Sequence, residues 1–337
     1  MKGWMWSGMA AAAALMLTGC ANNAPGTDDS SLPAKEGTSN SGGAAPAKKF
    51  KIAVSIPTAD HGWTAGVVDW ANKTAKEISA DADVQVFASE SAADQAAKLD
   101  TIATQGFDGL VILSFDPAAV TPSVKKNRDS FKYVVSVDRG LTEPIADVWM
   151  RGDNVKFGTE AGNFMAEKLA GKGNILVLRG ISGPVDNDRV KGFQDVMAKF
   201  PGIKVLDMQP ADWDQAKANK TVQAMLIKHK NVDAIWAADD DMALGAEAAL
   251  KEAGMDKVWI VGGGGSHVVV KRVMDGDPVF PATVTYSPMM IALSIKRCLE
   301  DLKAGKTSSG TQVDEVLPVD LVKPDNAKDH YFPDSVY

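Results

Sequence analysis

Between residues 109 and 140 the chain reads GLVILSFDPAAVTPSVKKNRDSFKYVVSVDRG, and this segment is the best guide to its fold. A first apolar run at 109–114 leads into a helical pattern at 117–127, and a second apolar run follows at 133–138. Apolar strands that alternate with helices are typical of a parallel sheet covered by helices on both faces. The sequence therefore predicts an α/β fold with a doubly wound parallel sheet.

The same alternation continues on either side of this segment. Upstream, apolar strands at 51–56 and 84–88 each precede a helical pattern, at 66–79 and 92–105. Downstream, a second series begins near Asn154. Its helices are predicted at 155–170, 188–200, 214–229, 242–254 and after Ser266, and its strands at 174–179, 203–209, 234–237 and 258–261. Two similar halves predict two lobes, each built on a doubly wound parallel sheet.

Length and composition narrow the range of functions. The 337 residues suit two domains and an appendage. The chain has 36 Lys and Arg against 43 Asp and Glu, a net charge of −7, and no basic block, so we expect no nucleic-acid partner. The two cysteines, Cys20 and Cys298, lie in different contexts, which argues against a disulfide or a cysteine metal site. We expect Cys298 to be a small buried apolar group. We also expect the protein to be a monomer.

Residues 1–20 are typical of an export signal. Lys2 gives a positive start, and the apolar run at 9–17 is too short to span about 30 Å of hydrocarbon. The sequence LTGC at 17–20 resembles a bacterial lipobox, so we expect lipid attachment at Cys20 and an extracytoplasmic, membrane-anchored protein. The alternative is an ordinary secretory signal with a chance cysteine. Residues 21–49 contain few large apolar side chains and predict a flexible tether.

Polar and aromatic residues follow the predicted strands in both halves. In the first half they are DHGW at 60–63, Phe115-Asp116 and DRG at 138–140; in the second they are residues 181–188, Asp212-Trp213, DDD at 239–241 and GGGG at 262–265. Ligands of open α/β sheets bind beyond the carboxyl ends of the strands. Asp and Gly also serve as helix caps and turns, which is the alternative for each of them. A Trp at such a place is harder to explain as a cap and suits a small polar ligand with one apolar face.

No motif in the chain indicates catalysis. The run GGGGS at 262–266 lacks the lysine of a P-loop and fails the dinucleotide fingerprint, because His267 stands at the third glycine. The sequence has no G-x-S-x-G elbow, its four histidines show no H-x-x-x-H spacing, and the aspartates at 239–241 do not follow an EF-hand pattern. We therefore expect no catalytic residue, no metal and no cofactor.

Four short motifs carry a family resemblance. They are DDDMALGA at 239–246, QPADWD at 209–214, SVDR at 136–139 and RGDN at 151–154. With these motifs the chain resembles the ribose-binding-protein-like (type 1) periplasmic sugar-binding proteins of ABC importers, from residue 51 to about 323. The resemblance implies two lobes joined by three hinge crossings, near 153–154, 286–287 and 317–318. The N-terminal lobe would hold residues 50–153 and 287–316, and the C-terminal lobe residues 154–286 and 317–337.

The resemblance also implies which residues bind the ligand. Carried over by position, they are His61, Trp63, Asp138, Arg139, Asn187, Trp213, Asp239 and Tyr286, with Gly264 beside them. The Asp138–Arg139 pair would accept hydrogen bonds from ligand hydroxyls and donate them to ligand oxygens. Trp63 and Trp213 would enclose the C–H face of a sugar or polyol.

Several of these positions differ from the ribose-binding pattern. Asn187 stands where an Arg is usual, Asp239 where an Asn is usual, Gly264 replaces an Asp, and Tyr286 replaces a Gln. We therefore expect a neutral sugar or polyol other than ribose, delivered to an ABC permease. The alternative is an amino sugar, another cationic metabolite or a quorum signal that feeds a membrane sensor. A repressor of related fold is disfavoured, because the signal and tether occupy the place of its DNA-binding helices.

Overall fold

The structure is a computed structural model that describes residues 49–337. The predicted export signal, the lipid-attachment residue Cys20 and the predicted tether up to residue 48 lie outside the described residues. Between residues 49 and 337, no helix is long and apolar enough to cross a membrane.

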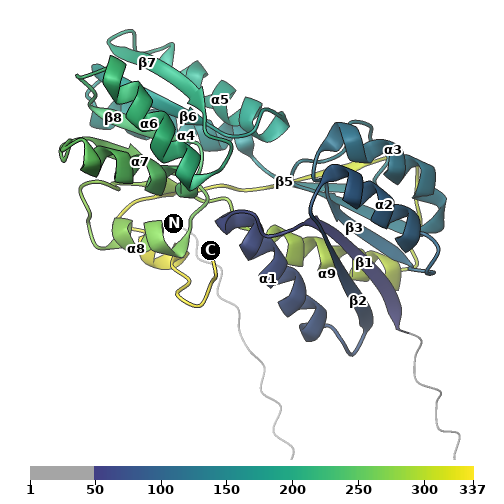
Figure 1. Cartoon of the computed structure of the whole chain (residues 1–337). Coiled ribbons are helices and arrows are strands. Elements are labelled where there is room, and N and C mark those ends of the chain that lie inside the picture. The colour runs from purple at the N-terminus through teal and green to yellow at the C-terminus, as the bar shows by residue number, and fades with distance from the viewer. Residues whose placement is uncertain (1–48) are drawn as a thin grey trace, which may run out of the picture. The chain divides into compact units, whose positions relative to one another are not determined.

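The first lobe is built on a six-stranded parallel sheet with the strand order β11-β5-β4-β3-β1-β2 (Figure 1). Its strands are β1 (Phe50–Pro57), β2 (Ala82–Ser89), β3 (Gly109–Leu113), β4 (Tyr133–Val137), β5 (Val148–Gly152) and β11 (Val313–Leu317). The central strands β3 and β4 are buried along their whole length, which explains why their sequences are almost entirely apolar.

Helices cover both faces of this sheet. One face packs against α1 (Gly62–Glu77) and α9 (Met290–Lys303), and the other against α2 (Ala92–Ile102) and α3 (Pro117–Asn127). Adjacent strand residues alternate between the two cores, so that Val111 faces α1 and α9 while Leu110 faces α2 and α3. Cys298 of α9 is completely buried against the sheet.

The second lobe is built on a four-stranded parallel sheet with the order β7-β6-β8-β9. Its strands are β6 (Gly173–Arg179), β7 (Ile203–Pro210), β8 (Ala234–Ala237) and β9 (Trp259–Val261). Its helices are α4 (Asn154–Lys168), α5 (Pro184–Met197), α6 (Gln215–Lys228), α7 (Asp240–Glu252) and α8 (His267–Met274). Helices α4 and α5 touch through glycines: a Cβ on Gly158 would lie 1.8 Å from the Arg189 carbonyl oxygen.

The chain passes between the lobes at three places. It leaves the six-stranded sheet between β5 and α4, returns between β10 (Thr283–Val284) and α9, and leaves again between β11 and β12 (Leu321–Val322). Strands β10 and β12 pair antiparallel in the second lobe. The short 3-10 helices η1 (Arg128–Ser130) and η2 (Ala327–His330) complete the elements of the described chain.

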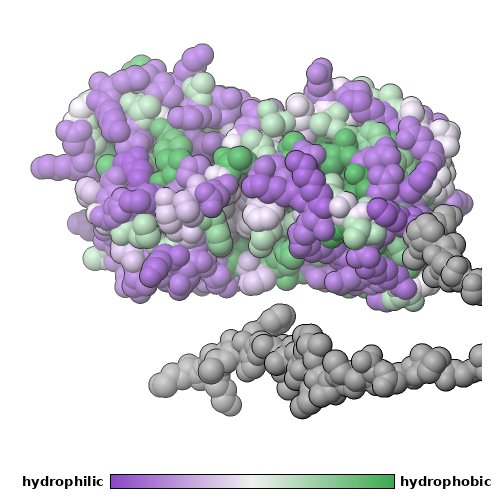
Figure 2. Space-filling model, turned by 90° about the horizontal axis from the view of Figure 1, so that it is seen from below, coloured by the Kyte–Doolittle hydropathy of each residue, from purple (hydrophilic) through white to green (hydrophobic). Residues whose placement is uncertain are grey.

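The predicted α/β class with parallel sheets is confirmed, and the differences concern element ends and four strands, of which β10 and β12 have two residues each. Helix α1 begins at Gly62, four residues before the predicted start, with His61 as its N-cap. The two longer of these strands, β5 and β11, were missed because half-buried residues interrupt β5 and because β11 has exposed and half-buried residues only. On the face shown in Figure 2, hydrophilic residues predominate and hydrophobic ones lie in small separate groups.

Candidate functional site

A cavity of about 210 Å³ lies between the two lobes, at the ends of strands from both sheets. Pockets for drug-sized ligands measure about 300–1,000 Å³, so this volume suits a smaller molecule. The residues singled out from the sequence that line the cavity are His61, Trp63, Asp138, Arg139, Trp213, Asp239, Gly264 and Tyr286. His61 and Tyr286 are 225 positions apart in the sequence, yet both line this cavity.

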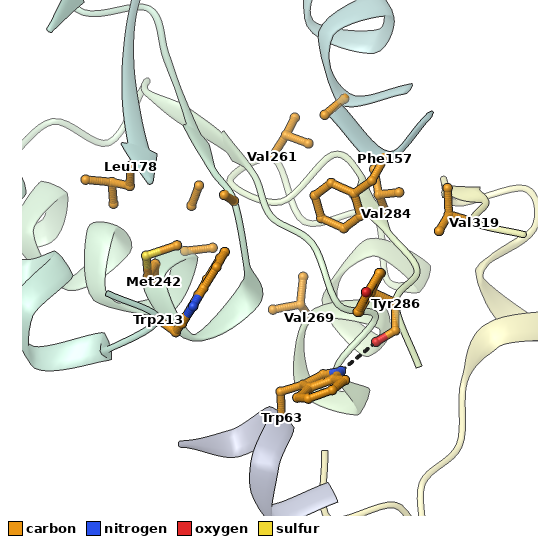
Figure 3. Close-up of a cluster of buried hydrophobic side chains, with 14 of the residues drawn as sticks. Trp63, Phe157, Leu178, Trp213, Met242, Val261, Val269, Val284, Tyr286 and Val319 are labelled. Carbon is orange, nitrogen blue, oxygen red and sulfur yellow. Dashed lines mark hydrogen bonds between the residues drawn. The ribbon is translucent and has the colours of Figure 1, made fainter. Parts of the chain in front are cut away.

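Two indole rings form apolar walls of the cavity. Trp63, in the first turn of α1, is 7% exposed, and Trp213, just before α6, is 8% exposed. The Trp63 indole N–H donates to the Tyr286 carbonyl oxygen at 2.8 Å (Figure 3). This bond leaves the faces of the Trp63 ring for apolar contact, and the ring lies 5.9 Å from that of Tyr286.

The backbone is strained where it presents residues to the cavity. Asp138, Asp212 and Trp213 have φ values of 56°, 56° and 64°, in the left-handed region. For a bulky residue such as Trp this conformation is a genuine outlier and costs on the order of 1–3 kcal/mol. The Trp213 ring packs over Gly180, where a Cβ would lie 1.9 Å from the indole. Strain of this kind collects at functional sites, which favours a role for Trp213 and Asp138 beyond packing.

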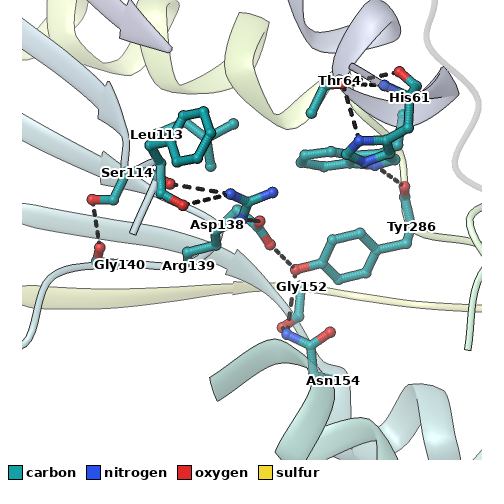
Figure 4. A network of polar contacts seen from close by, with 12 residues as sticks. His61, Thr64, Leu113, Ser114, Asp138, Arg139, Gly140, Gly152, Asn154 and Tyr286 are labelled. Carbon is teal, nitrogen blue, oxygen red and sulfur yellow. Dashed lines mark hydrogen bonds and ion pairs between the residues drawn. The ribbon is translucent and has the colours of Figure 1, made fainter. Parts of the chain in front are cut away.

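A chain of hydrogen bonds crosses the cavity wall from one lobe to the other (Figure 4). The Tyr286 hydroxyl donates to Asp138 Oδ1 at 2.5 Å and accepts from Asn154 Nδ2 at 3.3 Å. Asn154 Oδ1 in turn accepts from Arg189 Nε at 2.9 Å. Burial and the Asp138 carboxylate raise the pKa of Tyr286, so its phenol stays protonated and acts as the donor.

Two arginines bring positive charge to the cavity. Arg139 donates to the Phe115 carbonyl oxygen at 2.8 Å, and its Nε lies 3.8 Å from Asp138 Oδ2. Arg189 donates to the Ala238 carbonyl oxygen at 2.6 Å, and its guanidinium lies 4.3 Å from the Tyr286 ring centroid. Both arginines donate to backbone carbonyls that lie just after a strand, β3 for Arg139 and β8 for Arg189, and these bonds position them at the cavity.

Arg189 takes the place that the sequence reasoning gave to Asn187. Asn187 does not line the cavity; its Oδ1 accepts from Arg179 Nη2 at 3.1 Å. Arg189 lines the cavity and is 4% exposed. The available signal was helical spacing: Arg189 precedes the fully buried Phe193 by four residues and so shares its inward face of α5.

The three consecutive aspartates have separate partners. Asp239 caps α7 by accepting from the Met242 N–H at 2.8 Å, while Asp240 accepts from the Ser266 N–H at 2.8 Å. Asp241 reaches the other lobe and accepts from the Gly62 N–H at 3.0 Å. Of the three, only Asp239 lines the cavity.

Burial dominates the electrostatics of these aspartates. It raises the pKa of Asp239 well above the usual range, and the neighbouring Asp241 and Asp240 charges add to the shift. It also raises the pKa of Asp240 to about 6, although hydrogen bonds from Ser266 and Thr283 oppose the shift. Among residues 49–337 no three His, Cys, Asp or Glu side chains form a group that could hold a metal ion.

The loop before α1 is held by a compact polar cluster. His61 Nδ1 lies 2.6 Å from Asp60 Oδ1, and the Thr64 hydroxyl donates to the same oxygen at 2.7 Å. Burial alone would raise the pKa of Asp60, but these contacts outweigh it and lower the pKa to about 2. An ionised Asp60 fixes the orientation of the His61 ring at the cavity.

Comparison with known proteins agrees with this architecture. Residues 52–307 match the periplasmic binding protein domain family. A ribose import binding protein of Salmonella typhimurium is 31% identical over 274 residues, which cover 81% of this chain and 90% of the relative. A xylitol-binding protein of Mycolicibacterium smegmatis is 34% identical over 185 residues, which cover 54% of this chain and 53% of the relative.

A solved structure gives the same result. An ABC transporter solute binding protein from Mycobacterium smegmatis with bound glycerol is 27% identical and has a TM-score of 0.77. The match covers 86% of this chain and 99% of that protein. All three relatives are named as binding proteins, which confirms the expectation of a binding protein rather than an enzyme. From the family match, the relatives and the shared fold, we conclude that the chain belongs to the type 1 periplasmic binding protein family, as its resemblance to ribose-binding proteins predicted.

Proposed function

We propose that this protein captures a small sugar or polyol in the interlobe cavity and delivers it to an ABC permease. The observation that carries the proposal is the lining of that cavity, which combines the Trp63 and Trp213 rings with charged hydrogen-bonding groups from both lobes. Indole faces suit the C–H face of a polyol, while carboxylates and guanidinium groups suit its hydroxyls. The ligands in the relatives' names, ribose, xylitol and glycerol, belong to this chemical class.

The charges of the cavity favour a neutral ligand over a cationic one. Arg139 and Arg189 bring two positive charges to the cavity. Of its four side-chain carboxyl groups, Asp60 contacts His61 and Asp116 caps α3. Burial favours the protonated form of Asp239, which leaves Asp138 to face the two arginines. One part of the case for a cationic metabolite was the Asn in place of an arginine at 187, and Arg189 restores that positive charge. An amino sugar remains the second candidate, because an ammonium group could lie over an indole ring beside a carboxylate.

The proposed mechanism is closure of two lobes around the ligand, without covalent chemistry. The hinges would be the chain crossings near 153–154, 286–287 and 317–318. They would join an N-terminal lobe, made of residues 50–153 and 287–316, to a C-terminal lobe, made of residues 154–286 and 317–337. A ligand shifts this equilibrium only if it binds the closed form better than the open form. Contacts from Asp138 on one side and Trp213 on the other would meet that requirement.

Anchoring is a separate part of the proposal. Lipid attachment at Cys20, with residues 21–49 as tether, would keep the binding domain close to its permease at the outer face of the cell membrane. A diacyl-type anchor is needed for stable attachment, because a single acyl chain binds membranes only marginally.

A thermal-shift screen tests the ligand class. The wild-type protein is mixed with D-ribose, xylitol, glycerol and glucosamine, and a ligand at 100 times its Kd should stabilise the protein by about 2.7 kcal/mol. We expect a neutral compound to give the largest shift. A response to glucosamine alone would favour the amino-sugar candidate, and turnover of any compound would contradict a pure binding function.

Two variants locate the site in the same screen. Trp213→Phe and Asp138→Asn should each weaken binding about tenfold or more, since they remove ring area or a charged acceptor from the cavity. The matched control is Trp259→Phe, because Trp259 is half-buried in the same lobe and packs against Phe164, outside the cavity. Equal binding by Trp213→Phe, Asp138→Asn and the control would place the site elsewhere.

A further inference from the structure

Tyr337 is a wall residue of the cavity that the sequence reasoning did not find. It follows η2 on the tail of the second lobe, and Figure 1 shows this end of the chain beside the start of α1. The side chain lines the cavity and is 5% exposed. A residue of the tail therefore enters the same space as Trp63 and Asp239.

Glycines from both lobes make room for the ring. A Cβ on Gly264 would lie 2.0 Å from the Tyr337 hydroxyl, and Gly264 has a φ of +119°, which favours glycine. On the other lobe, a Cβ on Gly62 would lie 3.0 Å from Tyr337 Cδ2, and one on Gly66 would lie 3.0 Å from Tyr337 Cβ. Gly62 and Gly66 are one turn apart on α1, so they present one face to the ring. The Tyr337 side chain thus touches both lobes at once.

The hydroxyl of this ring has no partner. Within residues 49–337 the Tyr337 oxygen is buried and makes no hydrogen bond. Leaving a buried donor unpaired costs about 1–3 kcal/mol, so such groups in native proteins call for an explanation. Burial raises the pKa of Tyr337, and the charges of Asp240, Asp241 and Asp239 add to the effect, so the phenol keeps its proton.

We propose that the Tyr337 hydroxyl binds the ligand, by donating a hydrogen bond to a ligand oxygen in the cavity. The ring would then link ligand binding to contact between the lobes, because it rests on α1 of one lobe and on the glycine turn of the other. The inference rests on the proposed function. It adds that the bound ligand places an oxygen next to the glycine turn at 262–265.

Tyr337→Phe tests this inference, because it removes only the hydroxyl. By calorimetric titration with whichever of D-ribose, xylitol or glycerol binds the wild type best, we expect the variant to bind about five- to tenfold more weakly. The ligand-free variant should unfold at the same temperature as the wild type or higher, since it loses an unpaired buried group. Tyr331→Phe is the control: Tyr331 is half-buried in the same tail and does not line the cavity.

The outcomes separate this inference from the function on which it rests. Weaker binding in Tyr337→Phe but not in Tyr331→Phe, with the stability of Tyr337→Phe unchanged or higher, supports the inference. Wild-type affinity in Tyr337→Phe overturns the inference and leaves the proposed function intact. A loss of both stability and binding also overturns it, because the hydroxyl would then stabilise the fold rather than bind the ligand. If no sugar or polyol of a wider thermal-shift screen binds the wild type, the proposed function fails and the inference fails with it.

Discussion

Asp240 is a carboxylate that the fold has removed from water completely. It is 0% exposed, and its oxygens accept from the Ser266 N–H and from the Thr283 hydroxyl, each at 2.8 Å. It thereby fixes the turn after β9 to the start of α7, next to the cavity residue Asp239. Two neutral donors compensate an ionised carboxylate only in part, which is why its pKa rises to about 6.

This raised pKa makes the stability of the protein depend on pH. The usual pKa of 3.8 applies to the unfolded chain, so between about pH 4 and 6 the folded protein holds a proton that the unfolded chain has lost. The stabilisation is full below about pH 4 and is lost as the pH rises through 6, and a shift of about two units corresponds to about 3 kcal/mol. Asp239 and Asp241 have raised pKa values as well and add to the same trend.

Asp240→Asn isolates this contribution, since the amide carries no charge at any of these pH values. Measured by urea unfolding at pH 4, 5, 6 and 7, the stability of the variant relative to wild type should increase with pH, by up to about 3 kcal/mol. Asp256→Asn, at an exposed position of the same lobe, is the control and should follow the wild type. Parallel curves for Asp240→Asn and wild type would show that Asp240 titrates normally.

At the scale of elements, helix α4 ends in a way that its sequence does not favour. Ala170 has a φ of 51° and is exposed, and the following Gly171 has a φ of 74°. The Gly171 N–H donates to the Ala166 carbonyl oxygen at 2.9 Å, as in a helix-terminating turn. The left-handed conformation costs a residue with a Cβ roughly 1–2 kcal/mol, and glycine avoids that cost.

Ala170→Gly should therefore stabilise the protein. We expect a gain of about 0.5–1 kcal/mol in the free energy of unfolding, which is the relief of strain less the added entropy of the unfolded chain. Ala253→Gly is the matched control, because Ala253 is also exposed at a helix end but has a φ of −84°. The control should lose about 0.5–1 kcal/mol, and a loss of similar size in Ala170→Gly would contradict the explanation.

The elements also show how far the sequence could be read. Strands of mainly apolar residues such as β3 and β4 are buried on both faces, so their sequences alone identify them. β11 is an edge strand with exposed and half-buried residues only, and its pairing with β5 depends on a contact across more than 150 positions. Such pairing leaves little trace in a local pattern.

The same distinction applies to the candidate site. Residues placed directly after strands, such as Trp213 and Asp138, could be predicted, because strand ends gather at one edge of a parallel sheet. Arg189 lies inside a helix, and Tyr337 lies on a tail whose course depends on tertiary packing. Neither position follows from the order of strands and helices.

At the scale of the whole binding domain, few polar contacts join the lobes outside the hinge segments. The Gly62 N–H of α1 donates to Asp241 Oδ2 of α7, 179 positions away, and this bond requires that the lobes be close. The Trp63 indole N–H also reaches across, but its partner is a hinge carbonyl of Tyr286. Asp241 thus joins the two lobes without lining the cavity.

Asp241→Ala should weaken ligand binding although Asp241 does not line the cavity. If the closed form is the binding-competent one, a lower closed fraction reduces the apparent affinity in proportion, and loss of a hydrogen bond to a carboxylate predicts an effect of about tenfold. Asp195→Ala is the control, since Asp195 is exposed on the same lobe and pairs with Lys191 of its own helix. Calorimetric titration gives the affinities, and small-angle scattering of the ligand-free protein should show a larger mean radius of gyration for Asp241→Ala than for the control. Wild-type affinity together with an unchanged radius would mean that the Gly62–Asp241 bond does not hold the lobes together, and that closure depends on the ligand and the hinge network alone.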